Sequence, residues 1–370
     1  MNKTFNNRYI KSASSEVPLF YPRHQMTNGQ KIEGNYIPNE KLISTLAKCE
    51  SIYIYFYLKL LGDSLLFLST VQATLDYLSL SRKDNLPRLY AQSELKSLLQ
   101  HCSLFKNAIY IDNLEENFIK ASKDTIVGMI TDGDPFEYAS SSYVFNTEDY
   151  IYPKFTEVNS SNVVEEYRSR PARYYLTFER EVGVKLFGDP NKAIPFFEFS
   201  KSKEIEKRLK NNIGLSLNEF DTYVSLITFV NSKERQKQFG VVRYLEVAAK
   251  IQRKAGKKIC FVLLIHKSEE SKCWNEVVQY IHDHRDLNVC IYDGDDLEEM
   301  GYVLSRMDLH IGNDTGMSHL ASIVMDSKKV SLVPTIITYS RHDYGKWSTG
   351  VDSVYPVYTK LAKYLTDTNK

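Results

Sequence analysis

The densest group of residues that could do chemistry is the segment 308–321, which reads DLHIGNDTGMSHLA. Its apolar start predicts a short strand that ends at Gly312, and a helix is expected to begin near Thr315. A helix start of this kind offers free backbone N–H groups and the positive end of the helix dipole, which suit a phosphate or pyrophosphate. Gly312 and Gly316 would let a ligand's phosphates approach the backbone closely.

His319 lies one turn into this expected helix, where its imidazole can point at the same ligand. In the alternative interpretation, Asp314 or Thr315 only caps the helix and His319 is a packed helix residue. Open α/β sheets bind ligands at the carboxyl ends of their strands, so the spacing alone leaves both interpretations open.

The elements that must position this segment form two series of alternating strands and helices. Short apolar runs separated by helical stretches predict βαβ units on parallel sheets. The expected strands of the first series are 51–60, 86–92, 107–112 and 124–130, with helices at 64–78 and 93–102. Those of the second series are 221–230, 257–265, 287–293, 308–314 and 328–334, with a first helix at 241–256.

Composition excludes several classes of protein. A formal net charge of +1 over 370 residues gives no cationic excess for a nucleic-acid surface, and a hydrophobic content of 43% argues against a disordered chain. The five cysteines show no CxxC spacing, which indicates reduced thiols in a cytosolic protein. The amino terminus lacks an apolar signal-peptide core. The most apolar stretch, 52–71, contains Lys59 and Asp63, so a buried strand and helix are expected there rather than a membrane span.

Other chemistries find no support in the sequence. It contains neither a GxSxG nucleophile motif nor a Walker A motif, and no group of residues has the spacing of metal ligands. We therefore predict no metal and no cofactor.

The segment 308–321 resembles the D-[TS]-G-x-x-H-L-A signature of the heptosyltransferase family, which are glycosyltransferases of the GT-B fold. Further stretches resemble the family in the same order along the chain. They are LKLLGDSLLFLSTVQATLDYL at 58–78, NSKERQKQFGVVRYLEVAAKI at 231–251, DDLEEMGYVLSRMDLHIGND at 295–314 and LVPTIITYSRHDYGKW at 332–347.

The resemblance implies an α/β protein of the GT-B fold, with two Rossmann-like domains facing across a cleft. An irregular arm at 1–40 would precede an N-terminal acceptor domain at 41–215. The C-terminal nucleotide-sugar domain would span 216–350. A C-terminal helix is expected at 351–370, where it could pack against the first domain.

The family's catalytic base falls at Asp63. Inverting sugar transfer needs one carboxylate to take the proton of the attacking acceptor hydroxyl, because the nucleoside diphosphate leaves already ionised. Without the resemblance, an aspartate that caps the following helix is the commoner use of Gly-Asp before an apolar run.

The resemblance assigns donor binding to residues of the second domain. Ser232 and Lys237 would stabilise the leaving diphosphate without a metal, although charged runs of this kind are usually solvated loops. Glu269 or Glu270 would accept hydrogen bonds from the ribose hydroxyls. The resemblance points to Glu269, and a surface glutamate is the alternative. The other donor-binding residues would be Asp314, Thr315, Gly316 and His319.

The sequence thus predicts a cytoplasmic, inverting, metal-independent glycosyltransferase. It would move heptose or a related sugar from a nucleotide sugar, with an ADP-sugar favoured, to a glycan or a lipopolysaccharide-type, lipid-linked acceptor. Peripheral contact with the inner membrane stays open, and no nucleic-acid partner is expected. Two alternatives remain: a GT-B enzyme that acts on a protein or another glycan, and a catalytically inactive nucleotide-sugar-binding relative.

Overall fold

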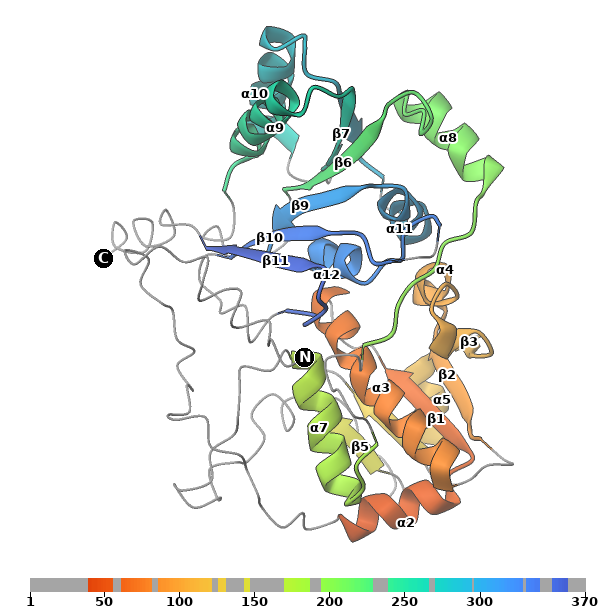
Figure 1. Ribbon diagram of the computed structural model, residues 1–370. Helices are drawn as coiled ribbons and strands as arrows, with labels where there is room; N and C mark the ends of the chain where they lie inside the picture. The colour runs from red at the N-terminus through yellow and green to blue at the C-terminus, as the bar shows by residue number, and fades with distance from the viewer. Residues whose placement is uncertain are drawn as a thin grey trace, which may run out of the picture. The chain divides into compact units, whose positions relative to one another are not determined.

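The computed structural model contains two compact units, each built on its own parallel sheet (Figure 1). The first unit consists mainly of residues 18–195 and the second mainly of 196–342. The residues that the structure describes are 39–55, 61–81, 86–121, 126–130, 143–146, 170–186, 194–228, 239–265, 270–294, 296–328, 331–339 and 348–358.

The first unit has a five-stranded sheet with the strand order β3-β2-β1-β4-β5 and parallel pairing throughout. Its strands are β1 (Ser51–Tyr55), β2 (Arg88–Gln92), β3 (Ile109–Ile111), β4 (Ile126–Ile130) and β5 (Tyr143–Asn146). Its α-helices are α2 (Glu40–Lys48), α3 (Leu61–Ser81), α4 (Lys96–Leu99), α5 (Leu114–Ala121) and α7 (Arg170–Val182). The central place of β1, with β2 and β4 on either side, is typical of Rossmann-like halves.

Helix α3 is the core of this unit because it is apolar around most of its circumference. Eleven of its residues are buried, and it packs against α7. Phe67 meets the ring of Tyr174 edge-on at a centroid distance of 5.8 Å. The hydroxyl of Tyr175 donates to Oδ2 of Asp76 over 2.7 Å. These contacts fix the helix whose first turn carries Asp63.

The second unit has a six-stranded parallel sheet with the order β11-β10-β9-β6-β7-β8. Counted from β6 as the first strand, this is the doubly wound order 3-2-1-4-5-6 of a Rossmann fold. The strands are β6 (Thr222–Ile227), β7 (Ile259–Leu264), β8 (Val289–Tyr292), β9 (Leu309–Asn313), β10 (Thr335–Tyr339) and β11 (Val354–Tyr358). The helices are α8 (Lys203–Ile213), α9 (Val241–Ala255), α10 (Glu270–Asp283), α11 (Leu297–Ser305) and α12 (Gly316–Ser322).

The two faces of this sheet differ because side chains alternate along each strand. Val224, Leu226 and Ile311 join residues of α9 and α10 in one apolar cluster. On the opposite face, Oγ of Ser225 and Nδ1 of His310 lie 2.5 Å apart, and both side chains are fully buried. Nε2 of His310 has no partner among the described residues.

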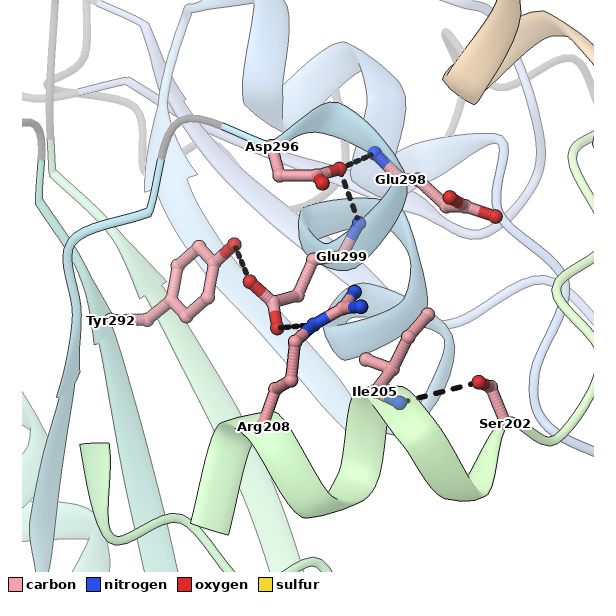
Figure 2. Close-up of polar contacts among 7 residues, drawn as sticks. All are labelled: Ser202, Ile205, Arg208, Tyr292, Asp296, Glu298 and Glu299. Carbon is pink, nitrogen blue, oxygen red and sulfur yellow. Dashed lines mark hydrogen bonds and ion pairs between the residues drawn. The ribbon is translucent and has the colours of Figure 1, made fainter. Parts of the chain in front are cut away.

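Helix α8 belongs to the second unit, so the boundary between the units lies at 195/196 rather than near 215/216. Figure 2 shows how α8 joins β8 and α11 through one carboxylate. Glu299 accepts from the Tyr292 hydroxyl over 3.2 Å and pairs with Nε of Arg208 at 3.5 Å. The hydroxyl of Tyr302 donates to Glu206 over 2.8 Å.

Two elements near the carboxyl terminus differ from the sequence-based expectation. The strand expected at 328–334 forms instead at β10, Thr335–Tyr339, where it pairs with β9. Residues 354–358 were expected in a C-terminal helix but form β11, which pairs with β10. Alternating side chains in TIITY and VYPVY suit two strands on the edge side of a sheet better than they suit a helix.

Of the expected arm at 1–40, residues 1–38 lie outside the described part of the chain. Within the described ranges, no helix is both long enough and apolar enough to cross a bilayer.

The buried His310 predicts a specific dependence of stability on pH. Burial lowers its pKa to about 3 from an ordinary value of 6.5. Between these pH values the unfolded chain binds the extra proton, so acidification from pH 7 to 5 should cost about 2 kcal/mol of unfolding free energy through this group. In the double variant Ser225→Ala/His310→Leu, the unfolding free energy measured with urea at pH 7, 6 and 5 should fall less than in the wild type. The difference between the two losses from pH 7 to pH 5 should be about 2 kcal/mol. The exposed His282 provides the control, since His282→Gln should keep the wild-type slope. An equal slope in the double variant would contradict the assignment.

Candidate functional site

The candidate site lies where β9 ends and α12 begins, at the topological switch point of the second sheet. β9 pairs with β10 on one side and with β6 on the other, and the chain order reverses between β6 and β9. In open α/β sheets, ligands bind outside the carboxyl ends of strands at such a switch point. The segment that the sequence singled out therefore occupies the position where this fold binds ligands.

Thr315 caps α12, and the turn Asp314-Thr315 connects the helix to β9. Thr315 has extended dihedrals of φ −141° and ψ 164°, and its hydroxyl accepts from the backbone N–H of Ser318 over 3.4 Å. Gly316 is the first residue of the helix, as expected from the sequence. The capping interpretation is thus correct for Thr315.

Asp314 pairs with His319 inside the protein. Their side chains are each only 4% exposed, and Nε2 of His319 lies 3.4 Å from Oδ1 of Asp314. Nδ1 of His319 is buried without a hydrogen-bond partner among the described residues. A buried ring nitrogen without a partner is rare in proteins, and it is explained when a ligand or water supplies the missing bond.

Gly312 allows α12 to pack closely against the end of β9. A Cβ at this position would lie 2.5 Å from Oγ of Ser318 and 2.9 Å from the carbonyl oxygen of Ile227. The glycine is therefore required by the packing of β9 between α12 and β6. The sequence predicted that Gly312 would let phosphates approach the backbone, and its close packing is a separate structural reason for a glycine there.

Polar residues that the sequence analysis missed lie at the same edge of the sheet. Asn313 ends β9 and is fully buried, and it bonds to Tyr244 of α9 and to the carbonyl oxygen of Thr228. Thr338 of β10 lies beside them. Of these three residues, only Asn313 lies in the segment 308–321 that the sequence singled out. Tyr244 and Thr338 lie far from that segment in the sequence, and their residue types are common in buried helices and strands.

Asp63 lies in the first unit, and the structure shows that it does not cap its helix. Helix α3 already begins at Leu61, which places Asp63 within the first turn with a partly exposed side chain. A carboxylate in the first turn of a helix lies near the positive end of the helix dipole.

The remaining candidates, Ser232, Lys237 and Glu269, lie outside the described residues. Within the described ranges, no group of three or more His, Cys, Asp or Glu residues could hold a metal ion.

Residues 170–347 match the model of glycosyltransferase family 9 (heptosyltransferase). The match includes the whole segment from β6 to β10 and therefore the site at Asp314 and His319. Residues 170–347 are thus similar to a glycosyltransferase family 9 domain. This confirms the resemblance noted in the sequence and the prediction of a glycosyltransferase. Asp63 lies outside the matched range.

Solved structures of glycosyltransferases share the fold of this chain. The ADP-heptose lipopolysaccharide heptosyltransferase II of E. coli has 12% sequence identity and a TM-score of 0.54, and the alignment covers 86% of this chain and 97% of that one. A family 9 glycosyltransferase of Veillonella parvula has 13% identity and a TM-score of 0.54, with 87% and 92% covered. The predicted GT-B fold is thereby confirmed. No curated protein sequence matches the chain.

The packing at Gly312 can be tested by adding one methyl group. We expect Gly312→Ala to lower the free energy of unfolding by about 1–3 kcal/mol, because neither the β6 backbone nor the capped helix can yield easily. Urea denaturation measures this loss. Adding Ser318→Ala should recover only part of it, since the Ile227 carbonyl contact remains. A loss below about 0.5 kcal/mol, the range of ordinary surface substitutions, would show that the edge is loosely packed.

Proposed function

We propose that this protein is an inverting glycosyltransferase that moves heptose or a related sugar from a nucleoside-diphosphate sugar to a hydroxyl group of a glycan or lipopolysaccharide-type acceptor. One observation carries the proposal. The family 9 match includes a buried Asp314–His319 pair at the carboxyl end of β9, next to the switch point of a Rossmann sheet.

The donor would bind at the turn between β9 and α12. The backbone of Thr315 and Gly316 lies at this edge of the sheet. Nδ1 of His319, which has no partner among the described residues, can bind an oxygen of the donor. Asp314 would orient the imidazole through Nε2. Ser232, Lys237 and Glu269 complete the proposed donor site, the first two on the diphosphate and the third on the ribose.

An ADP-sugar is the favoured donor. The support comes from the E. coli protein that shares the fold, whose name specifies ADP-heptose as its donor and lipopolysaccharide as its acceptor. At 12% identity this likeness shows the fold alone, so donor and acceptor are part of the proposal.

The proposed reaction is a single displacement at the anomeric carbon. The acceptor oxygen forms a bond to that carbon while the bond to the diphosphate oxygen breaks, which inverts the configuration. The hydroxyl proton passes to the carboxylate of Asp63, and the nucleoside diphosphate leaves with the bonding electron pair. One base is enough because the leaving group is already ionised. Fixed donors on the diphosphate, Lys237 above all, would stabilise the charge that develops there.

Binding of the nucleotide can be tested by thermal unfolding. At a concentration 100 times its dissociation constant, ADP should stabilise the native state by about 2.7 kcal/mol and raise Tm accordingly. Adenosine, which lacks the phosphates, should give a much smaller shift. If UDP or GDP stabilises the protein and ADP does not, the donor assignment is wrong; if none of the three does, the proposed function fails.

The role of the buried pair is testable in the same experiment. His319→Gln should reduce the stabilisation by ADP, because the ring nitrogen that we assign to the donor is lost. The matched control is His282→Gln on the exposed surface of α10, which should keep the full ADP effect.

The role of Asp63 is tested by separating binding from turnover. Asp63→Asn preserves shape but removes the base, so transfer from ADP-heptose should fall by roughly 10²-fold or more while the affinity for ADP stays within about twofold. The exposed Asp112, which follows β3 in the same unit, gives the control Asp112→Asn with wild-type transfer expected. Wild-type turnover in Asp63→Asn would exclude this aspartate as the base.

A further inference from the structure

A hydrogen-bond network joins three strand ends and one helix beneath the turn that carries Asp314. Asn313, the last residue of β9, donates from Nδ2 to the carbonyl oxygen of Thr228 over 2.7 Å. Thr228 directly follows β6. On its other side, Oδ1 of Asn313 accepts from the hydroxyl of Tyr244, and Oγ1 of Thr338 lies 3.4 Å away. One side chain thus connects β6, β9, β10 and α9.

The network determines which way the Asn313 amide points. Its Nδ2 can only donate, and it faces a carbonyl oxygen; its Oδ1 can only accept, and it faces a phenol hydroxyl. Thr338 lies 2.7 Å from the Tyr244 hydroxyl and 3.1 Å from the carbonyl oxygen of Gly312, so its single proton is shared between them. Asn313 is fully buried and Tyr244 is 5% exposed, so water does not readily replace a lost bond.

The phenol of Tyr244 acts here as a neutral donor. Burial raises its pKa above the ordinary value of 10.0, which keeps the proton on the oxygen at any physiological pH. The bond from Tyr244 to Asn313 therefore does not depend on pH in the range where an enzyme works.

The amide connects the end of β6 to the proposed donor-binding turn. Its Nδ2 bonds to the residue that follows β6, at the switch point of the sheet. Asn313 itself is followed directly by Asp314, Thr315 and Gly316. We infer that Asn313, fixed by Tyr244 and Thr338, is a positioning residue that sets the spacing between β6 and the donor-binding turn after β9. The inference rests on the proposed function, since it concerns the same donor site.

A second buried tyrosine of the same unit allows a matched comparison. Tyr223 is 6% exposed, and its hydroxyl donates to the carbonyl oxygen of Ser216 over 2.7 Å and accepts from the backbone N–H groups of Glu219 and Phe220. It lies near the amino-terminal end of β6, whereas Thr228 lies beyond the carboxyl-terminal end. Removing either hydroxyl breaks buried hydrogen bonds, but only Tyr244 is connected to Asn313.

The experiment compares Tyr244→Phe with Tyr223→Phe by calorimetric titration of ADP, at a temperature where both variants are folded. We expect both variants to unfold at lower temperature than the wild type. Tyr244→Phe should also bind ADP about tenfold more weakly, whereas Tyr223→Phe should keep the wild-type affinity. A purely structural role of Tyr244 predicts loss of stability with unchanged affinity in both variants.

Two substitutions of Thr338 test whether its hydroxyl is needed for ADP binding. Thr338→Val removes Oγ1 and should weaken ADP binding in the same direction, while Thr338→Ser keeps a hydroxyl and should bind ADP like the wild type.

The outcomes separate the two levels of the proposal. If the wild type binds ADP and Tyr244→Phe binds it equally well, or if Tyr223→Phe loses as much affinity, the positioning role is overturned and the proposed function stands. If the wild type binds none of ADP, UDP and GDP, the proposed function falls and this inference falls with it.

Discussion

The close contact between α12 and the end of β9 is the constraint on which the second unit's site depends. Because Gly312 has no side chain, Ser318 and Ile227 can both lie close to it. The helix then begins within three residues of the strand end, and its cap at Thr315 is fixed by the same packing. Asp314, Thr315 and Gly316 of the candidate donor site lie between this strand end and this helix.

Two histidines of this region have different neighbours. His310 lies within β9 beside the hydroxyl of Ser225, and burial keeps it neutral. His319 lies nine residues later, where its Nε2 is 3.4 Å from Oδ1 of Asp314. The first packs within the sheet, and the second lies in the helix that begins at the proposed donor-binding turn. Both belong to the same short strand–turn–helix, and only their neighbours distinguish them.

Polar contacts also join helix α8 to the rest of the second unit. Helix α8 precedes the first strand of the second sheet, yet Glu206 and Arg208 join it to α11 through Tyr302 and Glu299 (Figure 2). The sequence between the two alternating series gives no reason to place this charged helix in either unit. The contacts decide it, because a partly buried carboxylate such as Glu299 must be paired where it lies.

The sequence by itself determined the α/β class, the two series of strands and the chemistry-bearing turn at 308–321. It could do so because strand and helix periodicities, a helix cap and a signature are local properties of the chain. Tertiary structure alone decided that Val354–Tyr358 is a strand, since its pairing with β10 outweighs weak local preferences. It also decided that Asp63 is within α3 rather than at its cap, and that Tyr244, Asn313 and Thr338 meet at one edge of the sheet. Those three residues are far apart along the chain, and only the parallel packing of β6, β9 and β10 brings their polar atoms together, where burial requires that they bond to one another.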